Sequence, residues 1–163
     1  MGQIVKDKAE KARPATKAHT RYEEDLYTWV FEQVALLKAG RVAEIDVANI
    51  AEELADVGRS EESRLESALK VLLMHMLKWD QQPERRSRSW EATIREQRRR
   101  IARVLGKSPG LKARLSGILA EAYEDGRAWA AVETLLPEAD FPPECPYSWD
   151  EIQTRPFEVD PAS

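Results

Sequence analysis

A single stripe of side chains keeps one helical phase through the middle of the chain, over residues 50–79. At about 100° per residue, its members stay on one side of a helix. They are Ile50, Leu54, Val57, Glu61, Leu65, Ala68, Leu72, His75 and Trp79. Gly58 lies within this run, and a glycine weakens a helix interior and commonly ends a helix. The pattern fits one long kinked helix or two nearly collinear helices, and we predict two helices with a short break.

The residues before this stripe predict a basic arm followed by a helix. Residues 1–18 carry five lysines and arginines against two acids and have almost no apolar content, so we expect a flexible arm. A helix is expected to begin at Thr20, because Thr20 and Glu23 have the spacing of a capping box. Gly40 is expected to end this helix, and Asp46 is expected to cap the next one.

The residues after the stripe predict two more long helices. Pro83 should end the central element, and Ser87 or Ser89 can cap the helix that follows. We expect a last long helix over about residues 111–136, whose apolar face includes Gly126 and Trp129. A glycine on that face suits close approach of a neighbouring helix. Of the five tryptophans, all except Trp149 lie on stripes that we expect to form the core.

No stretch of the chain alternates apolar and polar residues as a half-buried strand does. Six prolines lie from Pro137 onward, together with several aromatic residues, which predicts an extended tail that packs onto the helices. Ser148 and Glu151 have capping-box spacing and predict one short helix in that tail. The sequence therefore predicts an all-α fold. We expect one domain over residues 19–163, a bundle of about five helices in which residues 137–163 form a Pro-rich wrap.

Composition excludes several classes of protein. The 163 residues include one cysteine, Cys145, so an internal disulfide and a cysteine-rich zinc site are both excluded. Apolar runs fall far short of the ~20 residues that cross a bilayer, and no apolar signal region is seen at the start. We therefore expect a cytoplasmic protein without a membrane segment. A formal net charge of -4 argues against bulk nucleic-acid binding but leaves local patches open.

Several segments together resemble a family of bacterial proteins known as domain of unknown function 29. They are YEEDLYTW, DVANIAEELADVGRSE, LLMHMLKWDQQPERRSRSW, TIREQRRRI and ECPYSWDEI. The resemblance covers roughly residues 22–152. It implies a small all-helical protein, and it brings no catalytic residue, substrate or cofactor to this chain.

A candidate polar site lies at the end of the stripe, where polar side chains are concentrated next to an apolar helical run. Its residues are His75, Lys78, Arg85, Arg86 and Gln97. A histidine in an apolar stripe could act as a general base, with cations nearby to hold an anion. A helical hairpin would also bring His75 level with residues 90–93, where a neutral imidazole could satisfy a buried polar contact. We favour that structural role, and an enzymatic role would require a solvent-reachable pocket at His75.

A second candidate is an arginine-rich helix. Eight arginines lie between Arg85 and Arg103 against two glutamates, which is typical of a phosphate or nucleic-acid site. Residues 44–66 carry eight acids against two arginines, so the two segments could neutralise each other. By helical phase, the stripe that points away from the core is Arg95, Arg99 and Arg103. We expect Glu91 to pair with Arg95, which weakens this stripe as an anion site.

Glu61 is the one carboxylate in the apolar stripe. Burying a lone charge costs several kcal/mol, so Glu61 must be paired, neutral or exposed by a helix break. We predict that it caps a helix start or bonds an arginine.

No nucleophile elbow, phosphate loop, dinucleotide fingerprint or carboxylate cluster is present in the sequence. We therefore expect no cofactor and no metal. The sequence favours a non-enzymatic protein that mediates interaction or regulation, with an unknown protein partner or by self-association. The alternatives are phosphate or nucleic-acid binding through the arginine-rich helix, and an enzyme with a cleft at the His75 hairpin.

Overall fold

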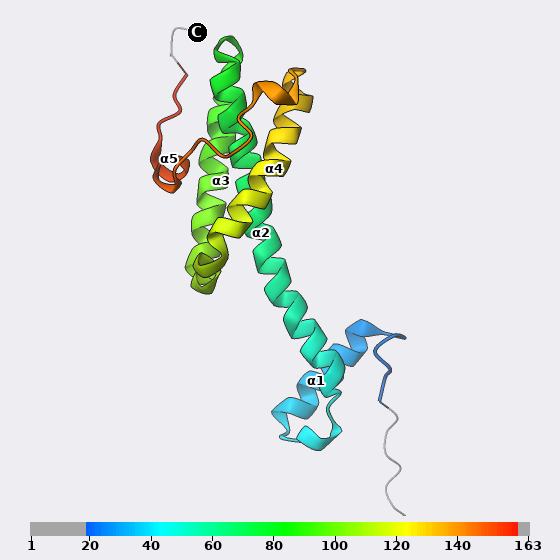
Figure 1. Cartoon of the computed structure of the whole chain (residues 1–163). Helices are drawn as coiled ribbons and strands as arrows, with labels where there is room; N and C mark the ends of the chain where they lie inside the picture. Colours follow the sequence, from blue (N-terminus) through cyan, green and yellow to red (C-terminus); the bar gives the residue numbers. More distant parts are fainter. Residues whose placement is uncertain (1–18, 160–163) are drawn as a thin grey trace, which may run out of the picture. The chain divides into compact units, whose positions relative to one another are not determined.

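The computed structural model describes residues 19–159, and the predicted arm, residues 1–18, lies outside the described residues. Within the described range the chain is all-α, as predicted, with five α-helices. These are α1 (Leu26–Lys38), α2 (Val47–Gln81), α3 (Arg88–Lys107), α4 (Leu115–Thr134) and α5 (Trp149–Thr154). Short 3-10 helices occupy Val42–Glu44, Pro83–Arg85, Pro109–Arg114 and Glu138–Asp140 (Figure 1).

The chain divides into two compact units, Met1–Glu53 and Leu54–Ser163. We call them the N-terminal unit and the C-terminal unit. Helix α2 begins in the first unit and continues into the second. The prediction of a single domain over residues 19–163 stays a prediction.

The predicted break at Gly58 is wrong, because α2 is one helix of 35 residues. Gly58 has no atom within 4 Å of the position a Cβ would take, so nothing forces the chain to turn there. Across it, Arg59 Nε donates to Asp56 Oδ1 at 2.8 Å, which bridges one turn of the helix. A glycine in a helix costs only about 1 kcal/mol relative to alanine, and the unbroken helical hydrogen bonding exceeds that cost.

The N-terminal unit is a helical hairpin of α1 and the first turns of α2. The prediction that α1 begins at Thr20 is wrong: Asp25 is the N-cap, and its side chain accepts a hydrogen bond from the Thr28 backbone N–H at 3.0 Å. Thr20 instead donates to Glu32 through its backbone N–H and its hydroxyl. Gly40 follows the end of α1 with φ of 68°, a left-handed conformation that favours glycine, and this confirms its predicted role.

Asp46 caps α2 as predicted, since its carboxylate accepts from the Asn49 backbone N–H at 3.2 Å. The two helices are joined by Gln33, whose Oε1 accepts from the Asp46 backbone N–H at 2.8 Å. Tyr22 packs edge-on against Trp29, with ring centroids 5.0 Å apart, and its hydroxyl donates to Glu53.

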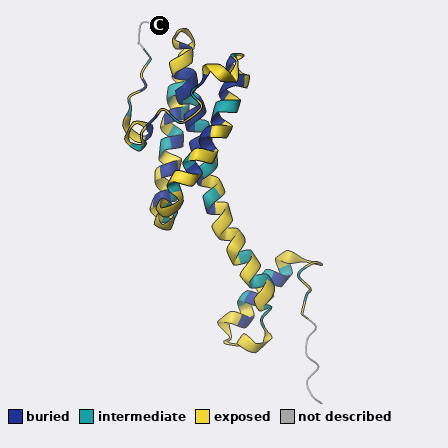
Figure 2. Cartoon of the chain, in the orientation of Figure 1, coloured by how far each residue is buried: buried dark blue, intermediate teal, exposed yellow. Residues whose placement is uncertain are grey.

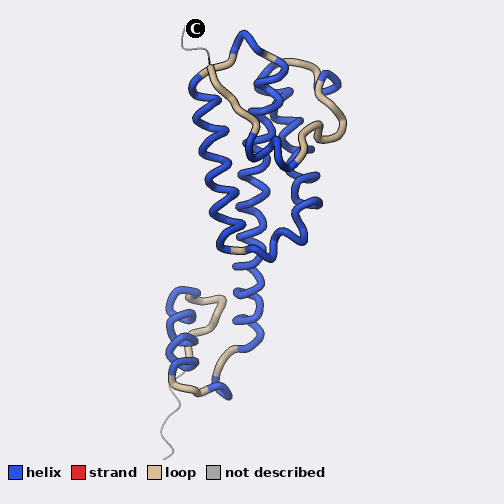
Figure 3. The backbone as a smooth tube through the Cα atoms, turned by 90° about the vertical axis from the view of Figure 1, so that its left-hand side faces the viewer, coloured by secondary structure: helices blue, strands red, loops and turns tan. Residues whose placement is uncertain are grey.

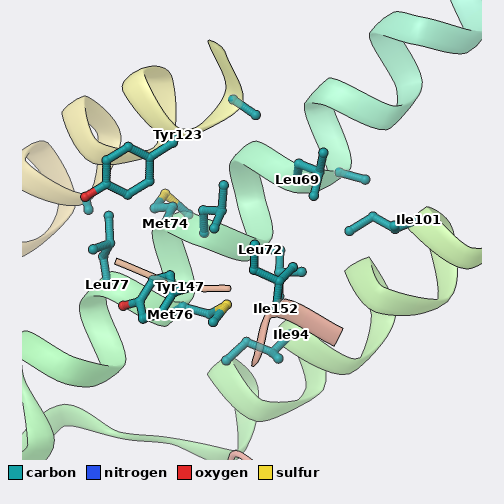
Figure 4. Close-up of a cluster of buried hydrophobic side chains, with 14 of the residues drawn as sticks. Leu69, Leu72, Met74, Met76, Leu77, Ile94, Ile101, Tyr123, Tyr147 and Ile152 are labelled. Atoms are coloured by element: carbon teal, nitrogen blue, oxygen red, sulfur yellow. The ribbon is translucent and has the colours of Figure 1, made fainter. Parts of the chain in front are cut away.

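The C-terminal unit packs α3 and α4 against the second half of α2. The sides of α3 and α4 that face α2 are apolar, and Figure 4 shows Ile94, Ile101 and Tyr123 pointing toward leucines and methionines of α2. Leu65, Leu69, Leu72, Leu73 and Met76 have no exposed surface. Ser87 caps α3 by accepting from the Trp90 backbone N–H, as predicted.

Helix α4 approaches α2 closely at Gly126. A Cβ at this position would lie 2.9 Å from the Lys70 carbonyl oxygen, which confirms the predicted close approach. The expectation that Trp129 belongs to the core is wrong, because Trp129 is 55% exposed. The buried stripe continues from Gly126 in steps of four to Ala130 and Thr134, where small side chains fit against α2.

The residues after α4 wrap the bundle as a tail of loops and short helices (Figure 3). Phe141, Ile152 and Phe157 of this tail are buried. The capping box of Ser148 and Glu151 is present at the start of α5, as predicted. Arg98 of α3 holds α5 in place by donating to the Ile152 carbonyl oxygen at 2.7 Å.

Candidate functional site

His75 lies half-buried on α2, and its Nδ1 is 2.8 Å from the Val71 carbonyl oxygen one turn earlier. A carbonyl oxygen only accepts, so Nδ1 carries the hydrogen and Nε2 is left as an acceptor. Burial lowers the pKa of His75 below its usual value, which favours the neutral ring. These contacts give His75 a structural place within α2.

Lys78 joins three helices in the C-terminal unit. It is 6% exposed and forms an ion pair with Glu133 of α4. Its Nζ also lies 4.5 Å from the ring centroid of Trp90 on α3, within the range of a cation–π contact. The ammonium group that could have held an anion beside His75 is therefore engaged in holding α3 and α4 to α2.

The other three members of the predicted polar site have different surroundings. Arg86 donates from Nε to the Trp79 carbonyl oxygen at 2.9 Å, which closes the end of α2, and Arg85 is exposed in the preceding 3-10 helix. Gln97 is buried on α3 and lines a groove of about 660 Å³ between α2 and α3. The residues that line this groove do not include His75. The predicted site is therefore a set of separate structural contacts.

The predicted arginine stripe divides between two grooves. Arg95 and Arg99 border a groove of about 590 Å³ between α3 and residues 152–158 of the tail. The floor of this groove is apolar and includes Ile94, Ile152 and Phe157. Arg103 instead lines the groove between α2 and α3.

Glutamates on the same helix flank the stripe. Arg95 lies 3.8 Å from Glu91, the predicted pair, and Arg99 lies 3.6 Å from Glu96. Both arginine side chains are more than half exposed, so these long ion pairs contribute little and leave the guanidinium groups accessible.

The acidic segment does not neutralise the arginine-rich helix in the way we expected. Glu61 and Glu62 pair instead with Lys107 and Arg114, at 2.9 and 2.7 Å, at the far end of α3 and beyond it. The reason is that α3 runs antiparallel to α2, so the acids of residues 61–62 come level with the residues that follow the arginine-rich segment.

Glu61 itself bears out its prediction. It is 8% exposed and accepts hydrogen bonds from Lys107 Nζ at 2.9 Å and Arg64 Nη1 at 2.7 Å. The bond from Lys107 is the main cause that lowers the pKa of Glu61 below its usual value. The carboxylate thus stays charged at the point where α2 enters the bundle.

Sequence reasoning missed one surface, the exposed apolar side of α1. Tyr27 is 75% exposed and Phe31 57% exposed, and their ring centroids lie 4.9 Å apart. Leu26 and Leu37 on the same helix are each about half exposed. We call Tyr27 and Phe31 the α1 apolar face. The sequence of the helix, LYTWVFEQVALLK, could have indicated this surface, because its only polar residues are Thr28, Glu32, Gln33 and Lys38.

The described residues of the N-terminal unit leave Tyr27 and Phe31 largely exposed. The buried side of α1 consists of Trp29, Gln33 and Leu36. At about 100° per residue, Tyr27 and Phe31 lie roughly opposite these residues on the helix. A surface helix normally turns a polar side to water, and a helix that is apolar on both sides is normally buried on both. Figure 2 shows how few residues of this unit are buried.

None of the described helices is both long enough and apolar enough to cross a bilayer. Within residues 19–159, no group of three or more histidine, cysteine, aspartate or glutamate side chains is placed to hold a metal ion.

Comparison with known proteins identifies one family. The family model described as "Domain of unknown function DUF29" matches residues 21–158. No curated protein and no solved structure matches the chain significantly.

Proposed function

The chain belongs to the family described as domain of unknown function DUF29, which assigns no activity, and we propose that it is a non-enzymatic interaction protein. The observation that carries this proposal is the α1 apolar face. Large exposed apolar patches are uncommon on proteins that work alone, and patches rimmed by polar residues mark interaction sites. Tyr27 is typical of the aromatic residues that dominate binding energy in protein interfaces.

The composition of the N-terminal unit supports the same function. A hairpin whose α1 contributes three buried side chains, one of them Gln33, has a small core for its length. A partner that covers Tyr27 and Phe31 would supply the missing apolar contact. The fold thus leaves an exposed apolar surface on α1 and a larger, well-packed bundle in the C-terminal unit.

The contacts of the polar side chains favour an interaction protein over an enzyme. Lys78 is committed to Glu133 and Trp90, Arg86 to the end of α2, and His75 to its own helix. An active site instead gathers such groups around one reacting atom.

Capture from a lysate of cells that naturally express the chain tests this function. The bait is the tagged full-length chain as wild type, as the double variant Tyr27→Glu/Phe31→Glu, and as the matched control Val132→Glu. Val132 is 69% exposed on α4, so the control introduces a negative charge at an exposed apolar position of the C-terminal unit. We expect a stoichiometric partner, including an untagged copy of the chain, with wild type and control but not with the double variant. Equal capture by all three baits would overturn the proposal.

The groove beside Arg95 and Arg99 supports a second candidate, binding of a phosphate-containing ligand such as nucleic acid. Two accessible guanidinium groups above an apolar floor can hold a phosphate and a base together. This function predicts that affinity for a single-stranded oligonucleotide falls steeply with salt, with a slope of about -0.7 for each phosphate contacted. If changing Arg95, Arg99 and Arg103 together to glutamate leaves fluorescence-anisotropy binding untouched, this candidate fails.

We place the interaction in the bacterial cytoplasm. The half-buried Cys145 is a free thiol, which suits a reducing compartment.

A further inference from the structure

We propose that the groove between α2 and α3 binds a small phosphomonoester, a phosphate group joined to an organic part that carries a hydroxyl. The groove has a volume of about 660 Å³, and all the residues that line it belong to the C-terminal unit. It shares no lining residue with the groove beside Arg95 and Arg99, and it does not involve the α1 apolar face. The proposal therefore goes beyond both functions proposed above and rests on neither.

Gln97 is the buried polar residue of this groove. It is 7% exposed and lines the groove from α3, and its amide makes no hydrogen bond within residues 19–159. In that part of the chain, no buried side-chain polar atom that is sealed from solvent lacks a partner, so the unbonded amide atoms of Gln97 reach the groove. A buried amide without a partner is unfavourable. Gln97 therefore offers a hydrogen-bond donor and an acceptor to a ligand in the groove.

The walls of the groove carry three guanidinium groups and one carboxylate. Arg100 pairs with Glu96 at 3.3 Å, and Arg64 pairs with Glu61 at 2.7 Å. Both arginine side chains are more than half exposed, and ion pairs of exposed arginines contribute little, so both remain available to an anion. Arg103 is exposed and has no acidic partner within the described residues. The groove therefore favours an anion, and guanidinium groups match the geometry of phosphate.

The register of the two helices brings serine hydroxyls opposite these arginines. Lys107 of α3 bonds Glu61 of α2 at 2.9 Å, and the helices run antiparallel, so each step back along α3 is a step forward along α2. The two arginines of α3 therefore come level with residues 65–68, beside Ser63 and Ser67, which line the same groove. Neither hydroxyl has a hydrogen-bond partner in the described part of the chain. A phosphate can thus be held between guanidinium groups of α3 and hydroxyls of α2.

The position of Gln97 selects what is attached to the phosphate. Gln97 precedes Arg100 by three residues, which is about 4.5 Å along the helix axis. A phosphate bound between Arg100 and Arg103 leaves the amide to the neighbouring part of the ligand. A hydroxyl both donates and accepts, as the amide does, so the two are matched partners. The volume of the groove also lies within the range of about 300–1,000 Å³ that is usual for small-molecule sites.

NMR titration of the isotope-labelled full-length chain tests this site. The probe is glycerol 3-phosphate, inorganic phosphate and glycerol are the comparisons, and sodium chloride keeps the ionic strength constant. We expect glycerol 3-phosphate to cause saturable shifts of the Gln97 side-chain amide and of the backbone amides around Ser67. Inorganic phosphate should bind more weakly, and glycerol should cause no saturable shift.

Three results of this titration would overturn the proposal. The absence of a saturable shift with either phosphate removes the site. Shifts confined to the groove beside Arg95 and Arg99 place phosphate binding elsewhere on α3. Equal affinity for glycerol 3-phosphate and inorganic phosphate removes the role given to Gln97.

One arginine variant and a matched control test the anion contact. Arg103→Gln should raise the Kd for glycerol 3-phosphate about tenfold, because it removes one charge-assisted hydrogen bond. Arg88→Gln should leave the Kd unchanged, since Arg88 is also exposed on α3, has no ion pair within the described residues and lines neither groove. The same Kd in Arg103→Gln as in wild type contradicts the site.

Gln97→Met tests the amide, because methionine keeps the length of the side chain and removes its hydrogen bonds. We expect the affinity for glycerol 3-phosphate to fall several-fold and the affinity for inorganic phosphate to stay as in wild type. The thermal midpoint should not fall, since the amide makes no hydrogen bond within the described residues. A clearly lower midpoint would show that the amide holds the fold together and would overturn its assignment to a ligand.

Discussion

Replacing Gly126 by alanine measures how closely α4 is bound to α2. Alanine is the better helix former by about 1 kcal/mol, so propensity alone predicts a more stable protein. The new Cβ, however, would lie 2.9 Å from the Lys70 carbonyl oxygen and 3.4 Å from the Met74 backbone nitrogen. Both neighbours are backbone atoms of α2, which cannot rotate away as a side chain can. The two helices must separate, and overpacking of this kind costs about 1–3 kcal/mol.

Gly117 provides the matched control, because it lies on the same helix and has no atom within 4 Å of its Cβ position. Gly117→Ala therefore gains propensity without a clash. The difference between the two variants removes most of the propensity contribution and leaves the packing cost. We expect Gly126→Ala to lower the free energy of unfolding by about 1–3 kcal/mol relative to Gly117→Ala.

Urea denaturation followed by far-ultraviolet circular dichroism gives this difference from the midpoints, provided the slopes agree. A Gly126→Ala variant as stable as Gly117→Ala would refute the close contact between α4 and α2. It would also remove the reason why the buried stripe of α4 turns toward Ala130 and away from Trp129.

Three further results are expected from the C-terminal unit. Leu135 has φ of 60° and is 87% exposed, so Leu135→Gly should relieve about 1–2 kcal/mol of left-handed strain. After the entropy cost of glycine, urea denaturation should show a net gain in stability of about 0.5–1 kcal/mol. Burial raises the pKa of Asp80, but hydrogen bonds from Arg155 and Tyr147 outweigh it and hold the pKa below its usual value. The stability that Asp80 contributes should thus be present above pH of about 3.9 and be lost as pH falls through the lowered pKa, and Asp80→Asn should flatten this acid limb of the stability curve. For His75, an NMR titration should give a pKa below about 6.5, since burial disfavours the charged ring, and a value above that would contradict its burial.

The helices could be predicted from the sequence wherever a local signal acts alone. The Ser148 and Glu151 capping box, the Ser87 cap and the left-handed Gly40 each depend on neighbouring residues, and each is present. The prediction at Thr20 is wrong because capping-box spacing alone does not show where a helix begins. Asp25, directly before the apolar residues of α1, is the residue that caps it.

The predictions at Gly58 and Trp129 are wrong for another reason: each outcome depends on how the helices pack against one another. Gly58 would end a helix if a turn were required, but the phase of α2 continues through it and no tertiary contact competes. Trp129 shares a helical side with Gly126, yet the close approach at Gly126 selects small residues next to it along α2.

The candidate sites were predictable as residues but not as contacts. The sequence marks Lys78 only as a cation that could hold an anion beside His75, and the fold brings Glu133 and Trp90 to it. The α1 apolar face was missed for the opposite reason. Its aromatic residues look like core in a sequence, and their exposure is known only once α2 is seen to cover the other side of the helix.

The proposed function requires that Tyr27 and Phe31 are covered in the working molecule, and photo-crosslinking in living cells tests this directly. A photoreactive phenylalanine analogue at position 27 keeps the aromatic shape, and the same analogue at position 132 serves as the exposed control. We predict a discrete adduct from position 27, with the mass of two chains if the partner is a second copy, and none from position 132. Absence of any adduct from position 27, or the same adducts from both positions, would contradict the claim that α1 is the binding surface of this protein.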